Sequence, residues 1–148
     1  MIRLSSALRA ALATDYGVAR MLQLGHIRVF SGEQPASADD ADQGEHLASI
    51  TQDGNDVYPG LTAGGLVLVP GPVAGACQNS GNWVLKVHRS GVAGWWRFYW
   101  NSYDGGRATD YTPRVDGTIG EGLVLPQPML TANQSEPIDS FFFFIPPT

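Results

Sequence analysis

The chain has 148 residues, 43% of them hydrophobic, and a formal net charge of −5. This length predicts one domain with a core of its own. Nucleic acid is a poor partner for it, because phosphate binding requires clustered positive charge and the nine Lys and Arg residues are scattered. The single cysteine, Cys77, excludes an internal disulfide and fits synthesis in a reducing cytoplasm, and the apolar run 141–145 is too short to span a bilayer.

Residues 4–15 are predicted to form a short amphipathic helix. Ser5 can cap its first turn, because a serine hydroxyl accepts a hydrogen bond from a free amide there. The leucines at positions 4, 8 and 12 recur at the spacing of one helical stripe. This stripe, Leu4, Leu8 and Leu12, is the first candidate contact surface.

A second helical turn is predicted over residues 18–24. Gly25 follows it and can adopt the left-handed conformation that often ends a helix. From residue 26 onward the pattern changes to short apolar segments separated by Gly, Pro, Asn and Asp. We therefore expect residues 1–25 to form a helical arm and residues 26–148 to form the main domain.

The main domain is predicted to be all-β. About eight short strands with turn residues between them are typical of an antiparallel, jelly-roll-like β-sandwich. Val, Ile, Leu and aromatic residues are enriched within these strands, as expected for pleated, half-buried segments. The predicted strands cover residues 27–30, 47–51, 66–69, 83–89, 95–101, 114–119, 123–125 and 138–145.

Two of these strands are expected to pair as a hairpin. Residues 83–89 alternate between apolar and polar, which is typical of a strand with one buried face. Residues 90–93 then form a short connection to the strand 95–101. Because sequential antiparallel strands are commonly joined by short turns, we predict that these two strands are neighbours.

The strand 95–101 carries large rings on both faces. Successive side chains point to opposite sides of a strand, so one face carries Trp96, Phe98 and Trp100 and the other carries Trp95, Arg97 and Tyr99. One face can fill the core, and the other needs a separate cover. Exposed aromatic surface usually marks an interaction site, although Arg97 can also stack between its neighbouring rings without any ligand.

The last predicted strand, residues 138–145, begins by alternating and ends apolar on both faces. Such a segment at an exposed edge would promote aggregation, so we expect both of its faces to be covered. A sandwich covers one face only. The other would be covered by the N-terminal helix or by another subunit, which is a second indication of an interface.

Catalytic, metal and cofactor patterns are not found in the sequence. His26, His46 and His88 lack the spacing of metal ligands, and Cys77 lies in an Ala- and Gly-rich segment typical of a buried small thiol. The acidic residues of 33–45 and the Asp53–Asp56 turn do not match a calcium loop, and a solvated loop is the simpler interpretation. We therefore expect a binding protein without cofactor rather than an enzyme.

Three segments of the chain resemble a family of small virion proteins of tailed phages and prophages. They are IRVFSGEQPASAD at residues 27–39, LASIT at 47–51 and GWWRFY at 94–99, preceded by a Leu-x-x-Ala-Leu helix. The chain departs from the usual pattern at Trp96, where phenylalanine is common, and in its aromatic C-terminal end. The resemblance implies a capsid cement, or decoration, protein with a jelly-roll fold.

The resemblance also implies partners and a place in the virion. Such proteins lie on the outer capsid surface, are made in the cytoplasm of the host bacterium and bind the major capsid protein; self-association is expected as a dimer in preference to a trimer. The residues expected to make these contacts are Leu4, Leu8, Leu12, Trp95, Arg97 and Tyr99.

Two other functions remain open at this point. A carbohydrate-binding jelly roll would stack sugar rings on exposed aromatic residues, and Trp95 and Tyr99 would form that platform. A minor tail or baseplate component of the virion is the other alternative. Copy number separates it from a cement protein, which is present in hundreds of copies, whereas a tail component is present in about three to a few tens.

Overall fold

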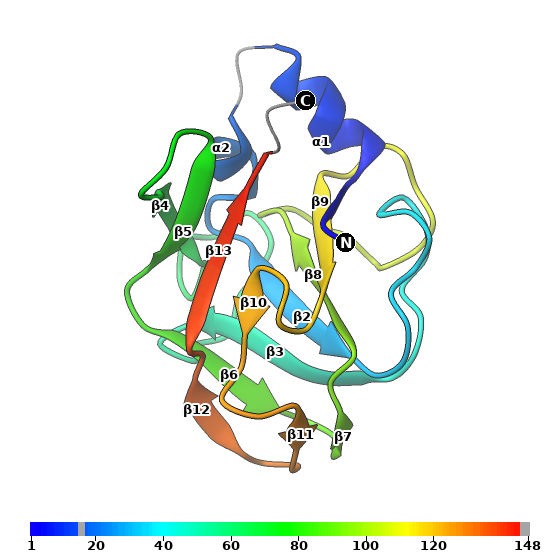
Figure 1. Ribbon diagram of the computed structural model, residues 1–148, viewed down its shortest axis with the longest axis vertical. Coiled ribbons are helices and arrows are strands. Elements are labelled where there is room, and N and C mark those ends of the chain that lie inside the picture. The colour runs from blue at the N-terminus through cyan, green and yellow to red at the C-terminus, as the bar shows by residue number, and fades with distance from the viewer. Residues whose placement is uncertain (15–16, 146–148) are drawn as a thin grey trace.

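The computed structural model describes residues 1–14 and 17–145 (Figure 1). In this part of the chain two short helices accompany thirteen strands, and the strands pair antiparallel throughout. The prediction of an all-β protein is therefore confirmed. All eight predicted strands are present, together with five short ones that the sequence pattern did not indicate.

Two sheets make up most of the molecule. The larger one contains, in spatial order, β1 (Arg3–Leu4), β9 (Arg114–Thr118), β8 (Trp95–Tyr99), β2 (His26–Phe30), β3 (His46–Gln52), β6 (Trp83–Val87) and β12 (Ser135–Pro137). The smaller one contains β10 (Leu123–Val124), β13 (Ser140–Phe144), β5 (Ala76–Ser80) and β4 (Val67–Pro70). A separate pair joins β7 (Gly91–Val92) to β11 (Met129–Leu130). In Figure 1, β13 passes in front of the larger sheet.

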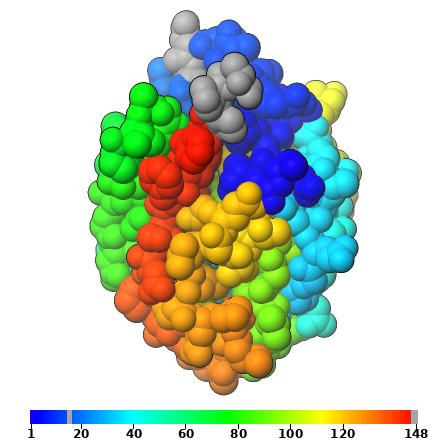
Figure 2. Space-filling model, viewed as in Figure 1, coloured from blue at the N-terminus to red at the C-terminus, as the bar shows by residue number. Residues whose placement is uncertain are grey.

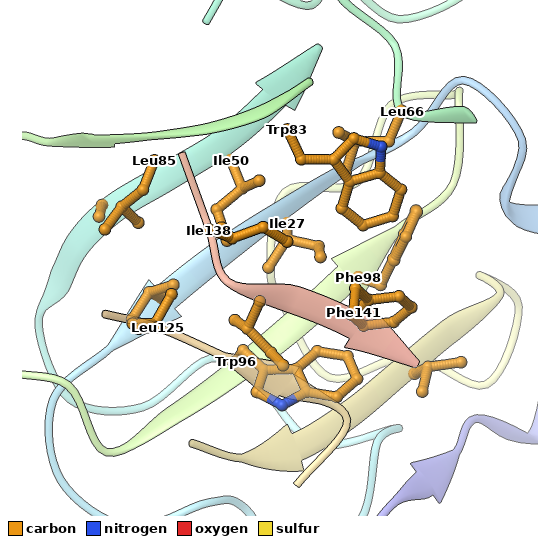
Figure 3. Packing of buried hydrophobic residues seen from close by; sticks show 14 of the residues in the cluster. Ile27, Ile50, Leu66, Trp83, Leu85, Trp96, Phe98, Leu125, Ile138 and Phe141 are labelled. Carbon is orange, nitrogen blue, oxygen red and sulfur yellow. The ribbon is translucent and has the colours of Figure 1, made fainter. Parts of the chain in front are cut away.

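The core lies between the two sheets and is centred on Phe141 of β13 (Figure 3). The centroid of its ring lies 5.2 Å from that of Trp83, 5.3 Å from that of Trp96 and 5.8 Å from that of Phe98. All three partners belong to the larger sheet, so Phe141 holds the layers together. A large aromatic side chain buries roughly 150–250 Å², which at about 25 cal/mol per Å² is on the order of 4–6 kcal/mol as an upper limit.

The N-terminal residues belong to this same core. Helix α1 (Ser6–Leu12) begins as predicted at Ser5, whose Oγ accepts a hydrogen bond from the amide of Leu8 at 3.2 Å. Leu8 is fully buried in the common core, and β1 extends the larger sheet through β9. The predicted last helical position, residue 15, lies outside the described residues. The described residues of this segment, 1–14 and 17–25, thus pack against the sandwich as part of it.

Helix α2 (Val18–Leu22) is also present, but it ends differently from the prediction. Leu24, with a φ of 65°, adopts the left-handed conformation expected for Gly25. A Cβ at Gly25 would lie only 1.9 Å from the carbonyl oxygen of Tyr99. Glycine is therefore required here because two backbone segments approach closely, and not because the helix needs a special terminal conformation.

The predicted hairpin is wrong, because β2 and β3 lie between β6 and β8 in the larger sheet. The connecting segment, residues 88–94, crosses the ends of these two strands. The amide of His88 donates to the carbonyl of Leu47 at 2.7 Å, and that of Gly94 donates to the carbonyl of Phe30 at 2.8 Å. These hydrogen bonds provide partners for backbone amides of the connecting segment. The segment can therefore run past β3 and β2 and join β6 to β8, two strands that are not neighbours.

Candidate functional site

The outer face of β8, the face directed away from the smaller sheet, is covered by the chain itself. Trp95, Arg97 and Tyr99 have no exposed surface. The indole of Trp95 stacks on Phe30 with ring centroids 4.5 Å apart and donates to the carbonyl of Gln43 at 3.2 Å. The expectation that this face waits for a partner is therefore wrong, because the loop between β2 and β3, residues 31–45, lies over it.

Arg97 fastens this loop to the sheet. Its guanidinium donates two hydrogen bonds to the carboxylate of Asp116, at 2.7 and 2.9 Å. It also donates to the Asp42 carboxylate and to the carbonyl of Asp40, both at 2.8 Å. Burial by itself lowers the pKa of Arg97, but the bonds and charge of Asp116 outweigh it and the net shift is upward. Arg97 therefore remains charged and serves the fold.

A second buried arginine fastens another loop beside the first. Arg114 donates to both carboxylate oxygens of Asp104, at 2.7 and 2.6 Å, and to the carbonyl of Asp40 at 3.1 Å. Sequence reasoning missed this cluster. The available signal was the sequence of β9, in which Arg114 and Asp116 occupy a strand that is otherwise apolar or small, since charged residues there require partners when buried.

The predicted helical stripe divides into buried and accessible residues. Leu8 is fully buried, whereas Leu4 and Leu12 are half-buried and pack against the edge of the core. Leu8 therefore cannot reach a partner in the folded chain. Leu4 and Leu12 each line a hollow on the molecular surface, so these two leucines of the stripe are accessible to a partner.

This apolar groove has a volume of about 500 Å³ and separates the N-terminal segment from β13. In Figure 2 the two segments, dark blue and red, lie close together on the same face of the molecule. The ion pair between the amino group of Met1 and Glu121 lies at the groove. The groove is lined by Met1, Ile2, Leu4, Glu121, Gly122 and residues 142–145.

One side of β13 is open along this groove. β5 pairs with Phe142, Phe143 and Phe144, whereas β10 on the opposite side pairs only with Ser140 and Phe141. The amide of Phe142 still donates to the carbonyl of Gly122 on that side, at 2.9 Å, and beyond Phe142 no strand among the described residues occupies it. A sheet edge beside apolar side chains can accept an added strand or a flat apolar surface from another protein.

The aromatic end of β13 is only partly covered. Phe141 and Phe143 are buried, but Phe144 is 49% exposed and Ile145 is 38% exposed. Of the two predicted covers for this strand, the N-terminal helix and another subunit, the described residues supply neither at Phe144, so another subunit is the cover that stays predicted. α1 does not cover Phe144, so the apolar surface that the sequence analysis assigned to the helix or to another subunit remains open.

The cysteine and two of the histidines have shifted pKa values. Burial raises the pKa of the Cys77 thiol to about 12, so it remains protonated and unreactive at neutral pH. Burial, followed by the charge of Arg28, lowers the pKa of both His26 and His46 to about 4. These imidazoles are therefore neutral at physiological pH, and His26 stacks on Tyr99 at 5.1 Å.

Two kinds of specialised feature are absent from the described residues, 1–14 and 17–145. These residues contain no group of three or more His, Cys, Asp or Glu side chains arranged to hold a metal ion. None of their helices is long and apolar enough to cross a membrane. Comparisons with protein-family models, with curated proteins and with solved structures found no match to this chain.

Proposed function

We propose that this protein is a capsid cement protein of a tailed phage, which binds the outer surface of the major capsid protein lattice and stabilises the shell. The observation that carries the proposal is the open apolar surface formed by Phe144, Ile145 and the adjoining groove. A monomer with such a surface at a sheet edge is prone to self-association unless a partner covers it. The resemblance of residues 27–39 and 94–99 to phage virion proteins supplies the identity of the partner.

The physical demands on a cement protein agree with this surface. It needs no catalytic group, only a rigid body with a contact patch, because its work is to connect neighbouring subunits. A capsid lattice offers many identical sites. Contacts that are individually weak can therefore stabilise the shell, because many of them act together. A groove of about 500 Å³ can accept a few apolar side chains or one extended segment of a capsid subunit.

The proposal extends to the fold and to self-association. Two facing antiparallel sheets with connections that cross between them are features of a jelly roll, and we assign this chain to that architecture. A dimer on the shell, in preference to a trimer, is part of the same proposal; the open edge of β13 can pair two copies only where it does not bind the capsid. Made in the host cytoplasm, the protein would reach the capsid during assembly.

The alternatives are affected differently by the structure. The carbohydrate-binding alternative loses its expected platform, because Trp95 and Tyr99 are fully buried. A minor tail or baseplate protein could use the same apolar groove, so this alternative is separated from the cement function by copy number in purified virions. A few tens of copies or fewer would indicate the tail.

Co-sedimentation with expanded shells that lack the protein tests the proposal. Saturable binding in a fixed ratio to the major capsid protein, with a higher temperature of shell disruption, is the expected result. Failure to bind correctly matured shells would overturn it. The shells must be expanded, because a cement site can be formed only when neighbouring subunits take their final positions.

A pair of variants locates the contact. Phe144→Asp introduces a charge into the open apolar surface and should weaken shell binding about ten-fold or more, since burying an aromatic side chain contributes roughly 2–3 kcal/mol. Tyr111→Asp is the matched control, because Tyr111 is 85% exposed and does not line the groove. Equal binding by the two variants would show that β13 does not face the capsid, even if the wild-type protein binds.

A further inference from the structure

A second surface feature lies on the outer face of the larger sheet, on the part that the loop 31–45 leaves open. It is a pocket of about 290 Å³, lined mostly by polar and charged residues and formed where β2, β3 and β6 lie side by side. Arg28 pairs with Ser49, and Ser49 pairs with Lys86, so the three side chains form one row across the strands. Cross-strand partners on one face are about 5 Å apart at Cβ, which brings two cations and a hydroxyl together.

The two cations in this row have unused hydrogen-bond donors. Arg28 carries five N–H groups, but among the described residues its guanidinium makes no hydrogen bond, and its ion pair with Asp42 spans 4.0 Å. Its remaining contact is with the ring of Tyr99, 4.9 Å away. Lys86 is exposed and has no ion pair within the described part of the chain. Both side chains line the pocket and could donate to one ligand.

The carboxylates near this row do not fill it. Asp42 accepts shorter hydrogen bonds from Arg97, at 2.8 Å, and from the hydroxyl of Tyr99, at 2.7 Å, and it does not line the pocket. Asp56 does line the pocket, from an exposed loop. A ligand beside Arg28 and Lys86 therefore meets two cations and one carboxylate, that of Asp56.

Ser49 lies at the centre of the row, and its hydroxyl oxygen lies within hydrogen-bond distance of two histidines, His46 and His88. Nε2 of His46 lies 2.9 Å from the carbonyl oxygen of Ala48, which can only accept, so Nε2 carries the proton and also donates toward Ser49 Oγ at 3.0 Å. On the other side, Nε2 of His88 lies 3.2 Å from the same Oγ. The hydroxyl hydrogen of Ser49 is thus free to turn toward His88 or toward a ligand.

We propose that this pocket binds a phosphate or sulfate ester of a small hydroxylated molecule, with the oxyanion held between Arg28 and Lys86 and contacted by Ser49. Arginine and lysine together with a hydroxyl donor form strong, charge-assisted hydrogen bonds to such oxygens. The volume is at the lower end of ligand pockets, about 300–1,000 Å³, which fits a molecule of sugar size. Asn55, Asp56 and the 57% exposed Tyr58 at the rim would contact its hydroxyl groups and ring.

This inference is independent of the cement function and is tested on the full chain alone. ¹⁵N-labelled protein is titrated with glucose 6-phosphate, glucose 6-sulfate, inorganic phosphate and glucose, and amide shifts are followed by NMR. Saturable shifts at Arg28, Ser49 and Lys86 with at least one ester, and none with glucose, are expected. The two esters distinguish a phosphate from a sulfate ligand. If neither ester causes saturable shifts at concentrations up to about 10 mM, any binding has a dissociation constant above that value and the proposal is overturned.

Variants separate a defined pocket from general charge attraction. Lys86→Gln should weaken binding of the ester about ten-fold, Lys86→Arg should restore most of it, and Ser49→Ala should weaken it a few-fold. Arg107→Gln is the control, because it removes the same charge from an exposed position outside the pocket. Equal weakening by Lys86→Gln and Arg107→Gln would refute a specific site.

Discussion

The outer face of β8 and the exposed side of β13 look alike in sequence, since both strands carry aromatic residues on two faces. In the structure they differ completely. Trp95, Arg97 and Tyr99 on β8 have no exposed surface, whereas Phe144 on β13 is 49% exposed. The loop 31–45 covers the first region through buried arginine and aspartate side chains, and no described segment covers the second.

The difference shows why aromatic content alone does not identify an interface. On the outer face of β8, the charged side chain of Arg97 forms hydrogen bonds that hold the loop 31–45 over this face. The rings of Trp95 and Tyr99 therefore become part of the interior. The end of β13 has no polar group that could fasten a cover, and its apolar surface remains available. Polar partners within the chain, rather than the rings themselves, decide which aromatic face is closed.

Breaking the cover of β8 should have the largest effect. Arg97→Leu leaves the buried carboxylate of Asp116 without its cation, which typically costs about 3–5 kcal/mol of unfolding free energy. Urea denaturation measures this loss. Arg89→Leu is the control, because Arg89 is 62% exposed and pairs with an equally exposed Glu45. A loss below about 1 kcal/mol in Arg97→Leu would mean that the loop is held by other contacts.

Acid should weaken the same cover. His26 and His46 pack on Tyr99 and Phe30, and their pKa values are lowered from 6.5 to about 4. The unfolded chain therefore binds more protons between these values, so stability is lost as the pH falls from about 6.5 to about 4. His26 contributes on the order of 3 kcal/mol to this loss, and His46, which is less deeply buried, contributes less because solvent screens its charge. In His46→Gln the free energy of unfolding, measured by urea denaturation between pH 4 and 6.5, should depend less steeply on pH. An unchanged slope would contradict this assignment.

A methyl group at Gly25 should disturb β8 from its end. Gly25→Ala places a Cβ 1.9 Å from the carbonyl oxygen of Tyr99, so the backbone must move, at a cost of about 2 kcal/mol. Thermal unfolding measures the change. Gly17→Ala is the matched control, because nothing lies within 4 Å of a Cβ at that position. Similar melting temperatures for the two variants would contradict the close approach.

Changing the open side of β13 should have the smallest effect on folding. Phe144→Ser removes a ring that is already half exposed, so the unfolding free energy should fall by less than about 1 kcal/mol. Self-association at high concentration should decrease, because less apolar surface remains at the edge. Light scattering and urea denaturation together test this. A loss as large as that of Phe141→Ala, about 3–5 kcal/mol, would place Phe144 in the core.

Local sequence patterns predicted which helices and strands form better than they predicted which strands pair with one another. Ser5 caps α1, and all eight predicted strands form, because caps and alternating apolar residues act within a few positions of the chain. β5 was missed, since Ala76 to Ser80 has weak strand preference and is held by pairing with β4 and β13. The pairing of β6 with β3 instead of β8 likewise depends on contacts far apart in sequence.

The all-β class, the short N-terminal helix and the aromatic residues that fill the core follow from local sequence patterns. The enclosure of Arg97 by the loop 31–45, the exposure of Phe144 and the row formed by Arg28, Ser49 and Lys86 become visible only in the folded chain. The physical reason is that burial and strand order arise from contacts between distant segments, whereas side-chain alternation and capping are properties of neighbouring residues.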